Sequence, residues 1–173
     1  QVWSSGVHEA RILASMVADP GAVTEDLMER WVRDFDSWDV CDQCCMNLFE
    51  RTQFAYRKAV EWCGLEEEFV KRAGFVLMAR LAVSDKKAQD TRFEEFLPLI
   101  KGGATDDRNF VRKAVNWALR QIGKRNLSLN VKAIETARVI QGMNSRSARW
   151  IASDTLRELT SGAVQSRLQG RGG

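Results

Sequence analysis

The sequence is poor in residues that interrupt helices and in residues that often build catalytic centres. Among its 173 residues it has two prolines, one tyrosine and one histidine. So few prolines, with abundant Ala, Leu, Glu, Arg and Lys, favour an all-helical chain. The single histidine, His8, lies beside Glu9 and near Arg11. We expect it to make an interhelical polar contact rather than to act as a catalyst.

Long apolar runs and a signal peptide are also lacking, so we expect no membrane partner. The chain has four cysteines, of which Cys41, Cys44 and Cys45 fall within five residues of one expected helix. A disulfide framework makes little sense there, and reduced thiols in a cytoplasmic protein are the expected state. Zinc spacing is a weak alternative, because no histidine lies nearby. We therefore expect no metal site.

Charge and aromatic content leave several function classes open. The net charge is +3, from 26 basic and 23 acidic residues, which permits nucleic-acid binding without implying it. A hydrophobic share of 45% is enough for one globular domain. Six tryptophans exceed the ordinary needs of a helical core, so some are expected to face a ligand. We assign Trp31, Trp62 and Trp150 to the core.

Hydrophobic periodicity and breakers predict nine helices with short turns. Thr24 is expected to cap the second helix, and Asp36 or Ser37 the third. The remaining Gly-, Ser-, Gln- and Arg-rich segment, 161–173, is expected to be a flexible tail after a domain spanning 1–160. The expected helices cover 7–18, 24–34, 38–51, 53–63, 66–83, 91–100, 107–122, 128–140 and 145–160.

An internal repeat decides between a helical bundle and a solenoid. The segment 70–81 aligns without a gap with 111–122, 41 residues later, and 147–152 is a fainter copy. A helix-pair unit of about 40 residues is the HEAT or armadillo period. The repeat predicts an all-α, right-handed solenoid of HEAT-like helix pairs whose second helices line a concave face.

Five side chains are expected on that concave face. Trp38 and Asp42 are four residues apart, so they share one side of their helix. Arg72 and Lys113 are equivalent positions of the repeat, and Trp117 is equivalent to Val76. Such a surface would be a polyanion groove that contains one acid. A protein-binding scaffold remains an alternative, because that function does not need a basic face.

Four motifs resemble the DNA alkylation repair glycosylases built from HEAT-like repeats, the AlkD-like family. The resemblance covers nearly the whole chain, and its last motif is long and fairly specific. The matching segments are Trp3-Ser4-Ser5 with His8-Glu9-Ala10-Arg11; Ser37-Trp38-Asp39-Val40-Cys41-Asp42, which is similar to W-D-x-x-D; Trp62 with Phe69-Val70-Lys71-Arg72-Ala73; and 109–120, which is similar to F-[IV]-x-K-A-[IV]-x-W-x-L-R.

The resemblance implies a monomeric, cofactor-free N-glycosylase. Its substrate would be duplex DNA carrying cationic N-alkylpurines such as 3-methyladenine and 7-methylguanine, excised without base flipping. It implies that Asp42 is the catalytic carboxylate, that Trp38 and Trp117 contact the lesion sugar, and that Arg72 contacts the DNA backbone. We add Lys113 as a second phosphate contact. Family members have further helices before Trp3, so we expect this chain to lack an N-terminal part.

The chemistry fits these residue types. A cationic alkylpurine leaves readily, and the remaining barrier is an electron-poor, oxocarbenium-like sugar. A carboxylate aimed at such a charge is typically worth about 3 to 4 kcal/mol, and an aromatic face adds about 0.5 to 2 kcal/mol.

Structural alternatives stay open for each site residue. Trp38 and Trp117 could belong to the core, and Asp42 could be a solvated acid. Arg72 could pair with Glu68, one turn earlier. Asp39 competes with Asp42 but suits the first turn of a helix. A non-catalytic relative that binds DNA by its shape is a further alternative.

Overall fold

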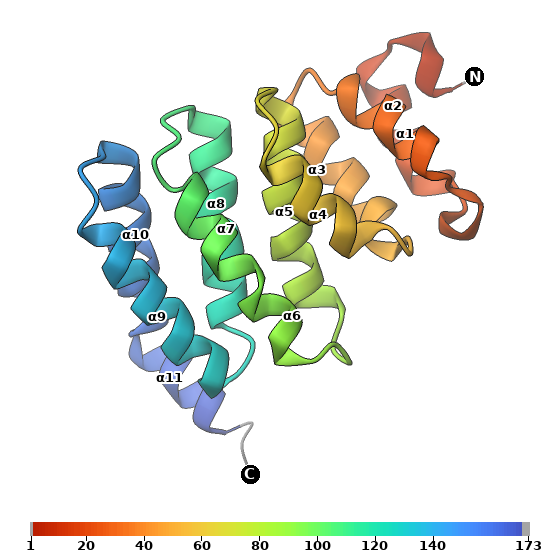
Figure 1. Cartoon of the computed structure of the whole chain (residues 1–173). Coiled ribbons are helices and arrows are strands. Elements are labelled where there is room, and N and C mark those ends of the chain that lie inside the picture. The colour runs from red at the N-terminus through yellow and green to blue at the C-terminus, as the bar shows by residue number, and fades with distance from the viewer. Residues whose placement is uncertain (1, 171–173) are drawn as a thin grey trace.

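The computed structural model describes residues 2–170, and its secondary structure over that range is entirely helical. Figure 1 shows the helices stacked along one direction from the N-terminus to the C-terminus. The α-helices are α1 (His8–Val17), α2 (Glu25–Arg33), α3 (Trp38–Asn47), α4 (Ala55–Cys63), α5 (Glu68–Ser84), α6 (Asp90–Glu94), α7 (Phe96–Gly103), α8 (Asn109–Gly123), α9 (Leu127–Gln141), α10 (Arg146–Leu159) and α11 (Gly162–Gln169). Short 3-10 helices cover Trp3–Ser5, Pro20–Ala22 and Phe49–Arg51.

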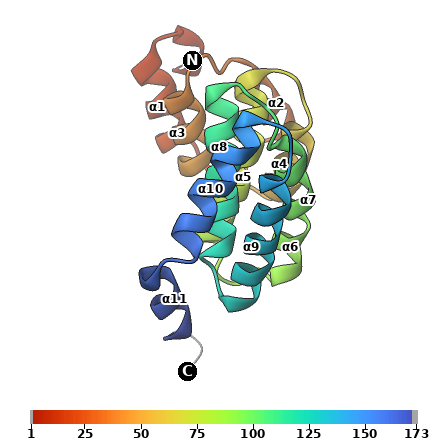
Figure 2. The ribbon, with the colours of Figure 1, turned by 90° about the vertical axis from the view of Figure 1, so that its left-hand side faces the viewer.

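The helices form two layers. Helices α3, α5, α8 and α10 follow one another in one layer, and α4, α7 and α9 form the other (Figure 2). Each helix of the first layer contacts its neighbours in that layer, and α5, α8 and α10 also contact α4, α7 and α9 respectively. This arrangement is the expected all-α solenoid. We call the outward surface of α3, α5, α8 and α10 the site face.

The 41-residue repeat corresponds to the helices α5 and α8, which make the most extensive contact in the protein. Val70 and its equivalent Val111 are both buried between the layers. Within the first of these repeats, Gly74 lets α5 approach α4 closely. A Cβ atom at Gly74 would lie 2.4 Å from the backbone nitrogen of Cys63.

Aromatic stacking holds the N-terminal segment against α2. The rings of Trp3 and Trp31 are stacked with their centroids 4.0 Å apart. The Trp3 indole N–H also donates to Asp34 at 2.8 Å. Helix α1 packs against α3, which brings the beginning of the chain beside the helix that carries Trp38 and Asp42.

Three expected features of the chain are wrong. The expected helix over 38–51 ends at Asn47, and Phe49–Arg51 form a separate 3-10 helix. The single helix over 91–100 is divided into α6 and α7, because Pro98 has no N–H to donate to the carbonyl four residues earlier. Pro98 instead occupies the first turn of α7, where helical N–H groups have no partner.

The tail 161–173 is not wholly flexible, because 162–169 form α11. The Ser161 side chain caps this helix, and Leu168 is buried. The Gln165 amide donates to Asn130 at 3.1 Å, which fastens α11 to α9. The end of the expected tail, 171–173, lies outside the described residues.

The cysteines lie in the core, as do two of the three tryptophans that we assigned to it. All four cysteines are free and buried, and burial raises the pKa of the Cys44 and Cys45 thiols well above the ordinary value. Trp62 is buried and Trp31 is half-buried. In the part of the chain that the structure describes, no helix is both long enough and apolar enough to cross a membrane.

Candidate functional site

The site begins at the first turn of α3. Ser37 has the extended backbone of an N-cap residue, but its hydroxyl makes no capping hydrogen bond, and Asp36 does not occupy the cap position. Trp38 follows as the first helical residue and is 51% exposed. An indole with that exposure is available to a ligand, and the alternative that Trp38 belongs to the core is not supported.

Asp42, one turn further along α3, forms a two-pronged ion pair with Arg72 of α5. The Arg72 Nε donates to Oδ1 at 2.9 Å, and its Nη2 donates to Oδ2 at 2.8 Å. The Asp42 side chain is 16% exposed and that of Arg72 is 7% exposed. Paired donors of this kind fix the plane of a carboxylate as well as its position. Asp42 is therefore a held, partly buried acid rather than a freely solvated one.

The same guanidinium reaches a third helix. Its Nη1 donates to the backbone carbonyl of Phe110 in the first turn of α8. Arg72 thus links α3, α5 and α8, and three of its five N–H groups donate within the protein. This geometry does not favour the expected contact of Arg72 with the DNA backbone, because the Arg72 side chain is only 7% exposed. The alternative pairing with Glu68 is not formed either.

The groups around Asp42 shift its pKa in opposite directions. Burial raises the pKa of Asp42 above its ordinary value, the hydrogen bonds and charge of Arg72 lower it, and the nearby charge of Asp39 raises it. The net pKa is raised, so burial is the larger effect. Without the guanidinium, the ionised form of this acid would be much harder to maintain.

Asp39, the competing acid, faces a different partner. Its Oδ2 lies 2.7 Å from the Nε2 of His8 on α1, which places the histidine in the expected interhelical contact. Burial works to raise the pKa of Asp39, but the hydrogen bonds it accepts, including those from His8 and the Val40 N–H, leave it lowered. The two acids of this turn therefore differ in role: Asp39 ties α1 to α3, and Asp42 joins the central helices.

Trp117 and Lys113 lie one repeat further along the site face. Trp117 is half-buried against the core, whereas its repeat equivalent Val76 is fully buried. Lys113 is exposed and forms no ion pair with the described residues. Because α5 lies between α3 and α8, Trp38 and Trp117 flank the helix that carries Arg72. The structure thus joins Asp42 directly to Arg72. Of the other three candidate residues, Trp38 lies on one side of α5, and Lys113 and Trp117 lie on the other.

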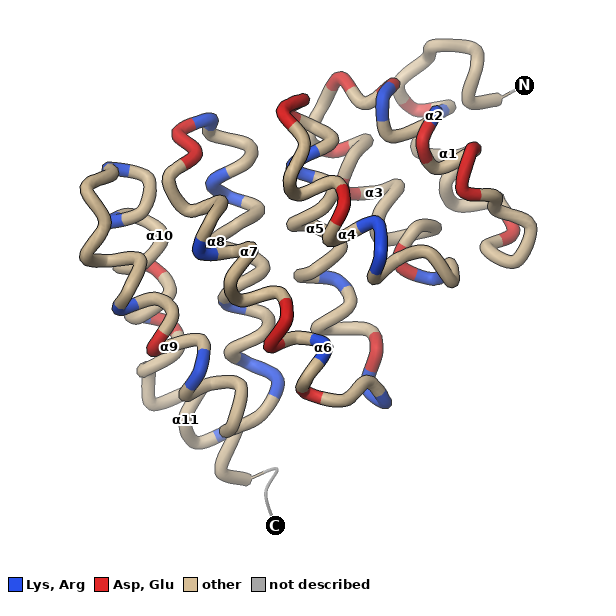
Figure 3. Tube along the Cα trace, viewed as in Figure 1, with Lys and Arg blue, Asp and Glu red and all other residues tan. Residues whose placement is uncertain are grey.

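The helix α8 supplies much of the positive charge of the site face. It carries three basic residues and no acidic one between Asn109 and Gly123. In Figure 3 the positively charged positions recur along α8, whereas both signs alternate in the N-terminal helices. Arg120 is paired with Asp154 and Glu158 of α10, so the charge on α8 that can attract a polyanion comes from Arg112 and Lys113.

Sequence reasoning missed two features of this face. Trp150, which we assigned to the core, is 39% exposed, and the Arg112 guanidinium lies 5.0 Å from its ring centroid. The Phe110 carbonyl was also missed. A backbone acceptor carries no residue-type signal, whereas the exposure of Trp150 could have been inferred from the basic residues beside it.

Comparisons with known proteins place the chain in a family. A model of the family described as "DNA alkylation repair enzyme" matches residues 1–159. A comparison with curated protein sequences found no match.

Solved structures show the fold. One belongs to "a new family of proteins related to the HEAT-like repeat DNA glycosylases with affinity for branched DNA structures". It is 19% identical, with a TM-score of 0.71 over 91% of this chain and 72% of that chain. An engineered protein from a structural genomics consortium is 15% identical, with a TM-score of 0.51 over 94% of this chain and 84% of that chain.

Proposed function

The chain belongs to the DNA alkylation repair enzyme family, and from this premise we propose that it is a DNA glycosylase that excises positively charged N-alkylpurines. The proposed substrates are duplexes containing 3-methyladenine or 7-methylguanine. The observation that carries the proposal is the Asp42 carboxylate, held by Arg72 beside an exposed Trp38. An acid and an aromatic face thus lie on one side of a single helix.

Arg72 acts in this proposal as a positioning residue for Asp42. A guanidinium is always protonated, so it favours the ionised carboxylate that partial burial would otherwise disfavour. An ionised carboxylate has about four lone-pair positions, of which Arg72 occupies two. The remaining lone pairs can face the C1′ of the lesion sugar, or orient the water that attacks it. No proton donor is required, because an alkylated purine leaves as a neutral base.

Trp38 and Trp117 supply the aromatic part of the site. The sugar becomes oxocarbenium-like as the glycosidic bond breaks, and an aromatic face near such a charge contributes about 0.5 to 2 kcal/mol. Lys113 is exposed on α8 and holds a backbone phosphate in this arrangement. The chemistry uses side chains alone and needs neither a metal nor a cofactor. In this proposal the base does not flip out of the duplex, because the Asp42 carboxylate acts on the sugar and not on the base.

The test is the release of 7-methylguanine from a duplex by the whole chain. Asp42→Asn keeps the shape of the side chain and removes its charge, so we expect the single-turnover rate to fall by about 10²–10³-fold. Asp39→Asn is the matched control, because it removes the neighbouring acid of the same turn, and it should stay close to the wild-type rate. Thermal unfolding and duplex binding of each variant separate lost chemistry from lost folding. Equal release by Asp42→Asn and wild type would overturn the role of Asp42.

The aromatic contribution is tested at the same time. Trp38→Ala should slow release by about 2- to 30-fold, the equivalent of about 0.5 to 2 kcal/mol, while Trp38→Phe retains most of the rate. Trp38 is exposed, so neither change should alter the unfolding temperature by much.

A second candidate is a protein that binds DNA of unusual shape without excising a base. The observation favouring it is the solved relative with affinity for branched DNA, which shares the fold at a TM-score of 0.71. The same experiment separates the candidates. Tight binding to a three-way junction with no release of 7-methylguanine would favour the second candidate over the first.

A further inference from the structure

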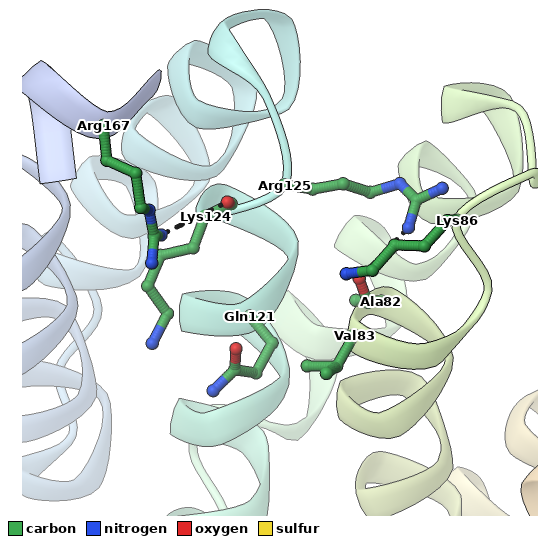
Figure 4. A pocket seen from close by; sticks show the side chains of 7 residues that line it. All are labelled: Ala82, Val83, Lys86, Gln121, Lys124, Arg125 and Arg167. Carbon is green, nitrogen blue, oxygen red and sulfur yellow. Dashed lines mark hydrogen bonds between the residues drawn. The ribbon is translucent and has the colours of Figure 1, made fainter. Parts of the chain in front are cut away.

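Basic side chains from three parts of the chain surround a pocket of about 380 Å³ at the C-terminal ends of α5 and α8. Its basic lining residues are Lys86, Lys124, Arg125 and Arg167, and no carboxylate lines it. In Figure 4, Arg167 and Lys124 border one side, Arg125 and Lys86 border the other, and Gln121 and Val83 lie between them.

Arg125 is held in place without being neutralised. Its Nη1 donates to the Ala82 carbonyl at 3.1 Å, and its Nη2 donates to the Ala88 carbonyl at 2.9 Å. Its guanidinium also lies 4.2 Å from the ring centroid of Phe93. Carbonyls and an aromatic ring carry no net charge, so the full positive charge of Arg125 remains at the pocket. A fixed cation of this kind loses little side-chain entropy when an anion binds.

The other cations leave the pocket with excess positive charge. Arg167 donates to the Lys124 carbonyl at 3.4 Å, which again leaves its charge uncancelled. Lys124 pairs at 2.7 Å with Glu158, a carboxylate that also accepts from Arg120. The Lys86 side chain forms no hydrogen bond or ion pair with any described residue. Among the described residues, the four basic residues of the pocket are therefore balanced only by Glu158, which Lys124 shares with Arg120.

The pocket lies on the same sides of α5 and α8 as the candidate site residues Arg72, Lys113 and Trp117. On α8, Gln121 follows Lys113 and Trp117 at intervals of four residues, so the three share one side of the helix. On α5, Val83 lies on the stripe that begins at Arg72. At 1.5 Å per residue, the pocket residue Gln121 lies about 6 Å from Trp117 along α8, and Val83 lies about 16 Å from Arg72 along α5.

We propose that this pocket binds a backbone phosphate of the same duplex whose lesion sugar lies against Trp38 and Asp42. The inference rests on the proposed function and adds a specific second contact to it. Phosphates along one strand are about 3.4 Å apart in the axial direction, so the phosphate lies about two to five nucleotides from the lesion, or across the groove on the other strand. The contact sets the register of the duplex on the solenoid and lies away from the reacting atoms.

The test measures duplex binding by fluorescence anisotropy at several salt concentrations. The probe is a duplex containing one 7-methylguanine. Lys86→Gln removes a charge that has no partner in the protein, so the fold should be preserved. We expect about 3- to 10-fold weaker binding at low salt, and a slope of log K against log salt that is shallower by about 0.9. Lys86→Arg should bind like wild type.

Lys101→Gln is the matched control, because Lys101 is an exposed lysine near the end of α7 in the other layer. It should leave both the affinity and the salt slope unchanged. A second arm replaces single phosphates of the duplex by neutral methylphosphonates. Neutralising the phosphate in the pocket should weaken binding by wild type more than binding by Lys86→Gln, because that variant has already lost one of the cations that face the phosphate.

The outcomes separate this inference from the proposed function. Unchanged affinity and slope in Lys86→Gln would overturn the pocket assignment and leave the glycosylase proposal standing. An equal loss in Lys101→Gln would also overturn it, because the effect would then be one of overall charge. Duplex binding with the expected Lys86 dependence but no base release would retain the pocket and reject the glycosylase. A wild-type protein that binds no duplex would overturn both.

Discussion

Asp42 and Arg72 are joined by two parallel hydrogen bonds between neighbouring repeats, at 2.9 and 2.8 Å, and each partner is largely shielded from water. The pair explains how a carboxylate can be both partly buried and charged. Burial raises the pKa of Asp42, and the guanidinium limits that rise. In the proposed reaction, Arg72 therefore favours the charged form of the acid without needing to touch DNA.

The first prediction concerns the pH dependence of base release. If ionised Asp42 is required, the rate falls as the pH is lowered through its raised pKa. Arg72→Gln removes the opposing charge, so the pKa should rise further and the acid limb of the profile should move to higher pH. The measurement is the single-turnover rate of 7-methylguanine release as a function of pH.

The conservative variant serves as the control for Arg72. Lys keeps the charge but cannot form the two-pronged pair, so Arg72→Lys should shift the acid limb less than Arg72→Gln does. A purely structural Arg72 would lower the rate equally at every pH. A profile of unchanged shape in both variants would therefore contradict the positioning role.

The second prediction concerns stability in acid. The Lys58 amine is nearly buried and lies 2.7, 2.8 and 2.6 Å from carboxylates of Glu25, Glu29 and Glu61. Hydrogen bonds from Arg57 and Lys58 lower the pKa of Glu25 from 4.5 to about 2. Burial acts to raise the pKa of Glu29, but its hydrogen bonds from Lys58 and Trp62 leave it lowered.

The lowered pKa values of Glu25 and Glu29 determine how stability changes with pH. Carboxylates with a lower pKa in the folded state contribute stability that is present above pH 4.5 and is lost as the pH falls toward about 2. Lys58→Met should lower the free energy of unfolding at neutral pH by about 1 to 3 kcal/mol, and should flatten its decline through that window. Urea unfolding at a series of pH values measures both effects. Lys101→Met, at an exposed lysine, should show neither, and a decline as steep as that of wild type in Lys58→Met would contradict the assignment.

The third prediction concerns the close contact between α4 and α5. A Cβ atom at position 74 would lie 2.4 Å from the Cys63 nitrogen and 2.8 Å from its Cα, and backbone atoms cannot move aside as a side chain can. Gly74→Ala should therefore lower the free energy of unfolding by about 2 kcal/mol or more, despite the better helix propensity of alanine.

Gly102→Ala provides the comparison. No atom lies within 4 Å of a Cβ built there, so the change should be neutral or should stabilise by up to about 1 kcal/mol. Chemical denaturation of both variants tests the contrast. Equal stability of the two variants would show that the helices can separate at little cost.

Local signals in the sequence predicted much of the fold. The Thr24 side chain caps α2 as expected, and the 41-residue repeat identified the solenoid through α5 and α8. The division between α6 and α7 at Glu95 was missed, because the surrounding apolar pattern continues through the break. Helix α11 was missed because its composition is that of a flexible tail, and its order comes from Ser161 and from contacts with α9.

The site was predicted less completely, for a physical reason. Trp38 and Asp42 belong to one helix, so their spacing alone is enough to put them on one side of it. The partner of Arg72 lies 30 residues away, whereas Glu68 stands one turn earlier and offers a local alternative. Pairing between repeats depends on how the helices stack. The spacing of residues within a single helix gives no information about that stacking.

Arg72 also has a mechanical consequence. A solenoid is held together by contacts between successive repeats. One guanidinium here spans three successive helices, with Asp42 on α3 at one end and the Phe110 carbonyl on α8 at the other. The spacing of those helices and the charge on Asp42 are therefore thermodynamically linked. A duplex that bends the solenoid on binding will shift the proton affinity of Asp42, and protonation of Asp42 will shift the curvature that the solenoid prefers by the same free energy.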